Sequence, residues 1–435
     1  MEALYFSTAS ELAAAIRQRR ISAVEVLEAH LEQIARQNPA LNAIVVLDEE
    51  GAHRRAYAAD KALAKGELWG PLHDVPYTLK DVHDTAGLRS TMGSPQLVDR
   101  VAVDDNTVAT RIKAAGGVLL GKTNARLFPD NPFGRTNNPW DLERSPGESS
   151  SGSVAAIAAG MTPIDIGSDI GGSITVPSHY TGVFGLRPTE RRVPVGKFAT
   201  DPFSVWRYAL VVGPMARSAA DLRLGMRIIA GPDPHDMDAI PLQWREVSRP
   251  ALHDLRIAWA SHFTNTPIDE DIQIAIEKLA SELDQLGAQV EQILPPVDLV
   301  EQCEWNIQFF KVTVGSFVSP HSSLGDYFEV LDRREAFIYQ WEKFLNEWDL
   351  FLCPAYHRTA QHHDQEEEGS SDSVRVELLS AVTGQPAVTV PLAKDKKGLP
   401  IGVQLMGRRW EDERLLEIAE LIAEVTGGFQ RPPGY

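Results

Sequence analysis

Residues 145–173 read S-P-G-E-S-S-S-G-S-V-A-A-I-A-A-G-M-T-P-I-D-I-G-S-D-I-G-G-S, the most unusual local composition in the chain. Two Gly/Ser-rich turns flank a run of small residues at 153–159, which predicts a helix, and an apolar run at 163–166, which predicts a strand. One such turn is weak evidence of a site, because Gly and Ser are common in loops. Two of them around a closely packing helix indicate a more specific structure.

The same alternation of apolar runs and helical segments extends on both sides of this stretch. It favours an α/β fold, in which helices cover a sheet. Thr8 with Glu11 and Ser22 with Glu25 have the spacing of capping boxes at helix starts, and we expect Asn38-Pro39 to end the second helix. The other predicted strands are 75–79, 118–120 and 183–186, and the other predicted helices are 106–115, 269–286 and 413–426.

Composition excludes several classes of protein. The chain has 435 residues, of which 43% are hydrophobic, and 42 Lys+Arg against 60 Asp+Glu give a formal net charge of −18. These values are typical of a globular protein and argue against a nucleic-acid partner, which requires a dense basic patch.

The sequence shows no signal peptide and no apolar run of the roughly 18–20 residues that span a bilayer, so we expect a cytoplasmic protein without a membrane partner. The two cysteines, Cys303 and Cys353, are expected to be buried free thiols.

The turn at the end of the opening stretch has the chemistry of acyl transfer. Ile170, Gly171 and Gly172 offer a run of backbone N–H groups that leads to the hydroxyl of Ser173. Such donors stabilise the negative charge that develops on a carbonyl oxygen under nucleophilic attack. The serine also needs a base. The histidines lie in no recognisable triad pattern and G-x-S-x-G is absent, so the base remains to be found.

Lys80 is the best candidate for that base. It ends the apolar run P-Y-T-L-K, which would deliver its amine from a buried strand, and burial lowers the pKa of a lysine. The alternative, which periodicity alone favours, is an ordinary surface ion pair between Lys80 and Asp81 or Asp84.

Several segments, taken together and in order, resemble the amidase signature family. The resemblance covers most of the chain and is weakest between residues 233 and 385. It implies a large mixed β-sheet packed between α-helices, an amide-hydrolysing activity and no cofactor or metal. The segments are P-L-H-D-V-P-Y-T-L-K-D-V-H-D-T-A-G (71–87), G-V-L-L-G-K-T-N (117–124), T-N-N-P-W-D (136–141), S-P-G-E-S-S-S-G-S-V-A-A (145–156), G-S-D-I-G-G-S-I-T-V-P (167–177) and G-L-R-P-T (185–189).

The resemblance also assigns roles to residues. It implies a Ser-cisSer-Lys triad in which Lys80 is the base, Ser149 is the bridging serine preceded by a cis peptide bond, and Ser173 is the nucleophile. The backbone N–H groups of Ile170, Gly171, Gly172 and Ser173 would form the oxyanion hole. Ser149 is preferred to its neighbours because it precedes Ser173 by 173 − 149 = 24 positions, the spacing typical of the family.

The chain departs from the family pattern at three places. Glu148 and Ser151 replace glycines, and the Glu148 carboxylate either favours a cationic substrate group or points to solvent. Thr175 stands where the family commonly has Arg, so Asp169 needs another partner or is partly solvated. The segment between Asn124 and Trp140 is shorter than usual.

Three competing signals are weaker. Residues 116–123, G-G-V-L-L-G-K-T, match the Walker A pattern, but their apolar middle predicts a strand instead of a phosphate-binding loop. A metal site near His357, His362 and His363 is disfavoured, because adjacent histidines do not share a helix face. Several aromatic residues either line an acyl pocket or, as we expect, pack in the core: Trp305, Phe309, Phe310, Phe317 and Tyr327.

We therefore expect an amidase that acts on a small-molecule amide, with homodimerisation possible. The alternatives are a glutaminase-type subunit of an amidotransferase complex and a non-catalytic amidase-like binding protein. We expect one domain over 1–435, with N-terminal helices in 1–45, a catalytic core in 70–225, a variable region in 240–385 and a C-terminal part of the sheet and helix in 386–435.

Overall fold

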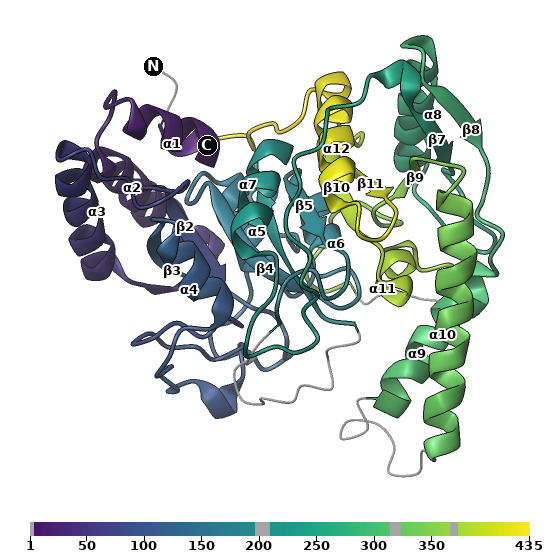
Figure 1. Ribbon diagram of the computed structural model, residues 1–435, viewed down its shortest axis with the longest axis horizontal. Helices are drawn as coiled ribbons and strands as arrows, with labels where there is room; N and C mark the ends of the chain where they lie inside the picture. Colours follow the sequence, from purple (N-terminus) through teal and green to yellow (C-terminus); the bar gives the residue numbers. More distant parts are fainter. Residues whose placement is uncertain (1–3, 196–208, 314–322, 366–372) are drawn as a thin grey trace.

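The computed structural model describes residues 4–195, 209–313, 323–365 and 373–435. Its central element is a mixed sheet in the order β1-β3-β2-β4-β6-β5-β10-β11-β9-β7-β8, with helices on both faces (Figure 1). The strands are β1 (Ile44–Leu47), β2 (Pro76–Lys80), β3 (Val118–Thr123), β4 (Ile164–Asp169), β5 (Phe184–Arg187), β6 (Val211–Ala216), β7 (Arg256–Trp259), β8 (Gln289–Gln292), β9 (Leu350–Pro354), β10 (Ala387–Lys394) and β11 (Pro400–Met406). The predicted α/β fold with a mixed sheet is confirmed.

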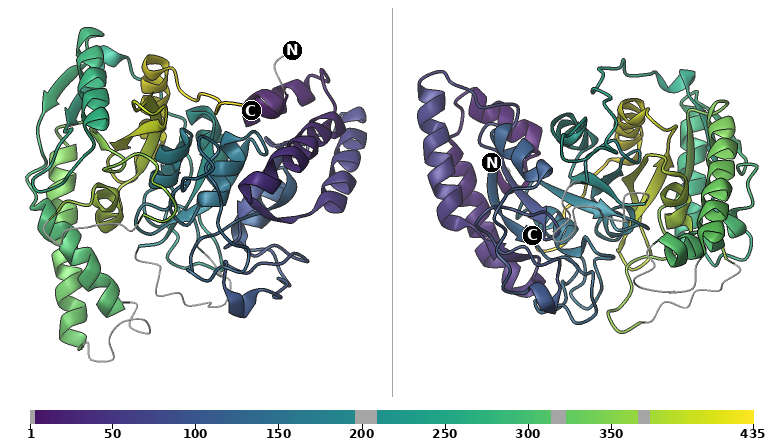
Figure 2. Two further views of the ribbon diagram at one scale, coloured as in Figure 1. Left: turned by 180° about the vertical axis from the view of Figure 1, so that it is seen from behind. Right: turned by 60° about the horizontal axis from the view of Figure 1, so that its bottom comes forward.

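Helices join the strands and cover the sheet. Figure 2 shows α2 and α3 at one end of the molecule and the long α10 at the other. The α-helices are α1 (Ala9–Arg17), α2 (Ala23–Leu41), α3 (Glu49–Ala64), α4 (Thr107–Ala114), α5 (Ser151–Ala158), α6 (Thr175–Thr181), α7 (Ala219–Ile229), α8 (Glu270–Gln285), α9 (Leu299–Thr313), α10 (Leu324–Leu345), α11 (Leu379–Thr383) and α12 (Asp412–Thr426).

Both predicted capping boxes are present, at the starts of α1 and α2. The expected end of α2 at Asn38-Pro39 is wrong, because the helix continues to Leu41. Asn42 then ends it in the left-handed conformation and donates its N–H to the Asn38 carbonyl. The Asn38 side chain accepts the N–H groups of Ala43 and Ile44 at 2.9 and 2.8 Å. These bonds outside the helix fix its last turn despite the proline.

Alternate side chains of β2 point to the apolar core and to the opposite face of the sheet, where the candidate site lies. Side chains in a strand point to opposite faces in turn. Tyr77 and Leu79 belong to the large apolar core that also contains residues of α4, α7 and α12. Thr78 and Lys80 therefore point to the other face, where α5 packs. The same alternation on β4 places Ile164 and Ile166 in that core.

Small residues allow α5 to lie very close to the sheet. A Cβ on Gly152 would be 2.3 Å from the backbone nitrogen of Asn124, immediately after β3, so glycine is required there. All eight residues of α5 are buried. This close packing brings the residues just before α5 over the ends of β2 and β4.

The segments that gave competing signals have structural roles. Val118–Thr123 is strand β3, so the Walker A match does not form a phosphate-binding loop. Trp305 and Phe309 are buried against Phe337, as expected for core packing. The side chain of Phe310 and all of Phe317 lie outside the described residues.

Candidate active site

Lys80 lies at the end of β2 with its side chain fully buried. Its Nζ donates to Ser149 Oγ at 2.6 Å, to Ser168 Oγ at 3.0 Å and to the Ser168 carbonyl at 3.3 Å. Within the described residues no carboxylate lies at ion-pair distance from this amine. Among these residues the hydrogen-bond partners of the lysine are all uncharged oxygen atoms.

The alternative of a surface ion pair for Lys80 is wrong. Asp81 pairs with the equally buried Lys122 at 3.2 Å, and Asp84 pairs with Arg100 at 2.5 Å. Both carboxylates therefore have other cations as partners.

Burial lowers the pKa of Lys80 to about 7, and this is the largest influence on it. The negative charges of Asp169, Asp165 and Glu148 act in the opposite direction and keep the pKa from falling further. Near neutral pH a large fraction of Lys80 is consequently an unprotonated amine, which can accept a proton.

This pKa makes a prediction about the pH dependence of the protein's activity. If neutral Lys80 is the base, kcat/KM should fall below pH 7 and approach a tenfold loss for each further pH unit, because the neutral fraction of the lysine falls toward that factor. A pH profile of kcat/KM on a neutral amide measures it. A profile flat from pH 5 to 8 would contradict this role.

Ser149 precedes α5, and its side chain is buried except for a small fraction. Its backbone carbonyl accepts the N–H of Arg126 at 3.1 Å. The cis peptide bond expected before Ser149 is wrong for this structure, since all peptide bonds among the described residues are trans. A cis bond before a residue other than proline costs about 3–4 kcal/mol, and the trans backbone already brings Ser149 Oγ to 2.6 Å from Lys80 Nζ.

Ser173 lies in the turn between β4 and α6 and is half-buried, so a ligand can reach its hydroxyl. Gly172, with φ of +102°, makes the sharp bend before it. No hydrogen bond joins Ser173 to Ser149 among the described residues. The structure therefore joins two of the three predicted triad residues directly, Lys80 and Ser149, and leaves Ser173 without a direct bond to them.

Asp169 holds this turn in shape. Its carboxylate accepts the N–H groups of Gly172 at 2.9 Å and Ile174 at 2.7 Å. The partner that Asp169 needs in place of an arginine at position 175 is Arg187 of β5, 2.9 Å away and fully buried. Sequence analysis missed Arg187, because no local pattern shows that β5 lies near the end of β4.

The bonds of Asp169 bear on the predicted oxyanion hole. The N–H of Gly172 donates to Asp169, so it is not available to a ligand in this arrangement. Within the described part of the chain, the N–H groups of Gly171 and Ser173 have no acceptor. Ile170 is partly buried and packs against two apolar clusters, one of them containing Trp305 and Phe309.

A cavity of about 600 Å³ is lined by Glu148, the residue before Ser149. The residue that replaces a family glycine therefore borders this space. The remaining lining residues include Arg126, Gly147, Val176, Tyr180 and His363. The wall is mixed in charge and polarity, which suits a ligand with both polar and apolar parts.

Two residues near Lys80 were also missed by sequence analysis. Ser168 bonds to the lysine through its hydroxyl, and Asp165 is a buried carboxylate on the same strand. Asp165 could have been noticed, because it interrupts the apolar pattern of Ile164 and Ile166 in a strand that is buried throughout.

Comparisons with known proteins identify the family. The model of the Amidase family matches residues 25–311 and 311–416. The chain belongs to the amidase signature family. This amidase is 31% identical over 476 residues to the acylamidase of Rhodococcus erythropolis, with 99% of this chain and 98% of the relative covered. It is also 31% identical to a glutamyl-tRNA(Gln) amidotransferase subunit from Roseiflexus sp., with 100% and 99% covered.

The fold agrees with this assignment. The amidase matches the crystal structure of a bacterial aryl acylamidase of the amidase signature family with a TM-score of 0.85 and 24% identity, over 97% of this chain and 96% of the other. The protein is an enzyme that hydrolyses amides. In the described ranges none of its helices has the length and apolar character required to cross a membrane.

The histidine cluster shows no sign of a metal centre. No group of three or more His, Cys, Asp or Glu side chains in the described residues could hold a metal ion. His362 instead contacts Arg144, and its Nε2 lies 3.0 Å from a guanidinium nitrogen. The acidic residues 366–368 lie outside the described residues.

Proposed function

We propose that this amidase hydrolyses carboxylic amides with Ser173 as nucleophile, Ser149 as bridge and Lys80 as base. The observation that carries the proposal is the 2.6 Å contact between the buried Lys80 amine and the Ser149 hydroxyl. A lysine whose pKa burial lowers to about 7 is neutral in about half of the molecules at pH 7 and can take a proton, and a serine hydroxyl between it and the nucleophile can pass one on.

The proposed reaction begins with attack of Ser173 on the amide carbon. Ser173 gives its proton to Ser149 as Ser149 gives its own to Lys80, and the C–O bond forms. The proton then returns along the same path to the amide nitrogen, the C–N bond breaks, and an acyl ester remains on Ser173. Water attacks this ester, loses a proton to the relay, and releases the carboxylic acid and free Ser173.

The oxyanion hole in this proposal consists of backbone N–H groups around Ser173. Ile170, Gly171 and Ser173 are the donors we favour. Gly172, which completes the predicted set, would have to release Asp169 to take part. Each donor that reaches the developing negative charge is worth about 3–4 kcal/mol of transition-state stabilisation.

The proposal is tested by activity and by covalent labelling together. A panel of aliphatic, aryl and amino-acid amides and a carbamate should include at least one substrate, and a fluorophosphonate probe should add one label per chain, on Ser173. Ser173→Ala should lose both hydrolysis and labelling. The control variant Ser281→Ala, which changes an exposed serine of α8, should keep both. Labelling that persists in Ser173→Ala would contradict the assignment.

A second candidate is a glutaminase-type subunit of an amidotransferase complex. The 31% identity to an amidotransferase subunit over the whole chain favours it as much as the acylamidase relative favours the first. Glutamine in the same panel separates the two. Hydrolysis of simple amides without glutamine supports an independent amidase, and activity on glutamine alone supports the amidotransferase role.

A further inference from the structure

Asp165 of β4 is a buried carboxylate that the proposed relay does not use. It is 0% exposed, and its Oδ2 accepts the hydroxyls of Thr78 at 2.6 Å and Thr123 at 3.0 Å. Thr123 Oγ1 also lies 2.9 Å from Ser153 Oγ. One polar network therefore joins β2, β3, β4 and α5 beneath the candidate active site.

The network lies on the same face of the sheet as Lys80. Thr78 precedes Lys80 by two positions on β2, so the two side chains point the same way, and Thr78 is paired in register with Asp165. The carboxylate is close enough that its charge acts on Lys80, although the two are not in direct ion-pair contact.

Asp165 is costly to keep in this position. Within the described residues its Oδ1 has no hydrogen-bond partner and no cation pairs with it. An apolar side chain like those of Ile164 and Ile166 would avoid the desolvation cost of a buried charge. The hydroxyls of Thr78 and Thr123 offset only part of this cost, so the position of the carboxylate on the Lys80 face of the sheet gives the better reason for it.

We propose that Asp165 is a positioning residue that, through its negative charge beneath Lys80, sets the charge state of the lysine and thereby the acidic limit of hydrolysis. This inference rests on the proposed function, because it concerns the same lysine.

The direction of the effect follows from the charges. Burial raises the pKa of Asp165 to about 6, so the group is mostly ionised at pH 7, where Lys80 exchanges its proton. A negative charge stabilises the protonated lysine and raises its pKa. Removing the charge should lower the pKa of Lys80 and extend activity to lower pH.

Other charged groups act on the same pair of residues. Asp169 and Glu148 act on Lys80 in the same direction as Asp165. Lys122 on β3 favours the ionised form of Asp165, and both lysines disfavour a charge on His83, whose pKa burial lowers to about 3. None of these groups changes in the variants below, so a shift reports on Asp165.

The experiment compares pH profiles of kcat/KM on one neutral amide. The acidic limb is the part of the profile in which kcat/KM falls as the pH is lowered. In Asp165→Asn the midpoint of this limb should lie about one pH unit lower than in the wild type. At one unit below the wild-type midpoint, the fraction of plateau activity should therefore be about fivefold higher in the variant. Thr78→Val removes one hydrogen bond from the carboxylate and makes it harder to ionise, so it should move the limb less, in the same direction. Asp221→Asn, a buried carboxylate that accepts the N–H groups of Ala9 and Ser10, should leave the limb in place.

The outcomes are distinguishable. A limb unmoved in both Asp165→Asn and Thr78→Val overturns the inference while leaving the proposed function intact, and so does a limb that moves equally in Asp221→Asn. If Asp165→Asn does not fold, Thr78→Val decides. No hydrolysis of any amide by the wild type, or a wild-type profile without an acidic limb, counts against the proposed function itself.

Discussion

Lys80→Met is expected to lower kcat/KM for amide hydrolysis by about 10³-fold or more while leaving the protein folded. The loss follows because methionine cannot accept the proton that Ser149 must give up, and positioned proton transfer contributes about 10²–10⁴-fold. The fold should persist because the buried amine makes no ion pair, and replacing a buried polar group with an apolar one of similar size removes a desolvation cost. Steady-state kinetics and urea unfolding measure the two effects.

Lys122→Met is the matched control. Lys122 is equally buried on the adjacent strand, but it pairs with Asp81 at 3.2 Å and donates to the His83 carbonyl at 2.6 Å. Its loss leaves a buried carboxylate unpaired, which costs about 3–5 kcal/mol of stability. Lys80→Met should therefore lose activity and keep its stability, whereas Lys122→Met should lose stability. Activity near the wild-type level in Lys80→Met would refute the role of the lysine.

Arg187→Met is expected to lower the free energy of unfolding by about 3–5 kcal/mol. Arg187 is fully buried, bonds to the Asp169 carboxylate at 2.9 Å and to the Asp169 carbonyl at 3.0 Å, and without it that carboxylate remains buried without a cation. Urea unfolding measures the loss. The double variant Arg187→Met/Asp169→Asn should be less destabilised than Arg187→Met alone, because no unpaired charge remains.

Arg227→Met provides the comparison for this prediction. Arg227 pairs with Glu246 at 3.0 Å on the surface, where both side chains are more than half exposed, and such pairs contribute about 0–1 kcal/mol. A loss in Arg187→Met no larger than that in Arg227→Met would show that the buried pair does not hold the turn before Ser173.

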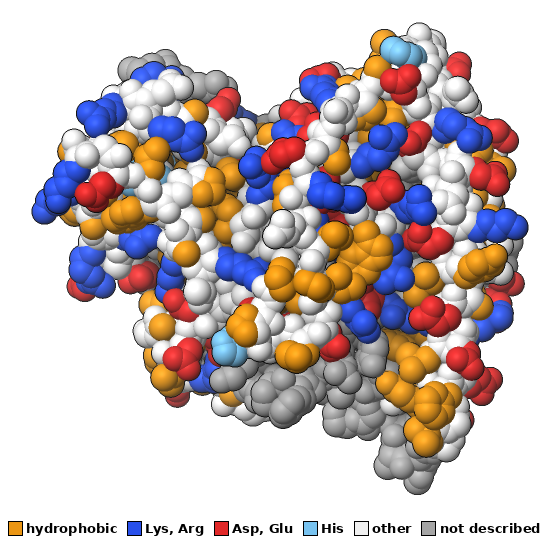
Figure 3. Space-filling model, viewed as in Figure 1, with side chains coloured by type: hydrophobic (Ala, Val, Ile, Leu, Met, Phe, Trp, Pro, Cys, Tyr) orange, Lys and Arg blue, Asp and Glu red, His pale blue; other side chains and the backbone are white. Residues whose placement is uncertain are grey.

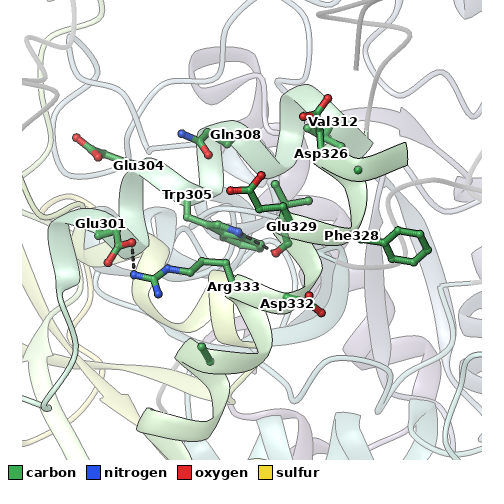
Figure 4. Close-up of a pocket in the computed structure, with 13 residues that line it drawn as sticks. Glu301, Glu304, Trp305, Gln308, Val312, Asp326, Phe328, Glu329, Asp332 and Arg333 are labelled. Atoms are coloured by element: carbon green, nitrogen blue, oxygen red, sulfur yellow. Dashed lines mark hydrogen bonds and ion pairs between the residues drawn. The ribbon is translucent and has the colours of Figure 1, made fainter. Parts of the chain in front are cut away.

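A second cavity lies far from the residues of the proposed relay in the sequence. This cavity of about 1030 Å³ lies between α9 and α10 and is rimmed by acidic side chains, with an ion pair between Arg333 and Glu301 (Figure 4). Apolar side chains gather at the lower end of α10 in Figure 3, where Leu324 and Phe328 are exposed, while Lys/Arg and Asp/Glu side chains are interspersed over the rest of that face. None of the groups that act on Lys80 lines this cavity, so the proposed function does not depend on it.

Local patterns predicted the elements that carry the site. The apolar run before Lys80, the small residues of α5 and the glycines before Ser173 gave β2, α5 and the following turn close to their observed bounds. These features are local, since strand alternation and close helix packing are determined by neighbouring residues. The family resemblance then selected Ser149 from three consecutive serines, which periodicity alone could not do.

The parts that could not be predicted depend on contacts between distant segments. Arg187 meets Asp169 only because β5 and β4 both pair with β6. Asp165 on β4 accepts a hydrogen bond from Thr123 on β3, and β2 lies between these two strands. Lys122 forms the ion pair with Asp81 that had been considered for Lys80. Each pairing depends on strand order, which the sequence does not specify locally.

The strand order also limits how the polypeptide can be divided. Every residue proposed to act on the substrate precedes position 240, yet β5, the outermost strand that this half contributes to the sheet, pairs with β10 from beyond position 386. A truncated gene product ending at position 240 would contain the whole proposed catalytic machinery and still leave β5 as a bare edge, a known cause of aggregation. A split form of this enzyme would need both halves to be co-expressed, so that β10 of the second half can pair with β5 of the first.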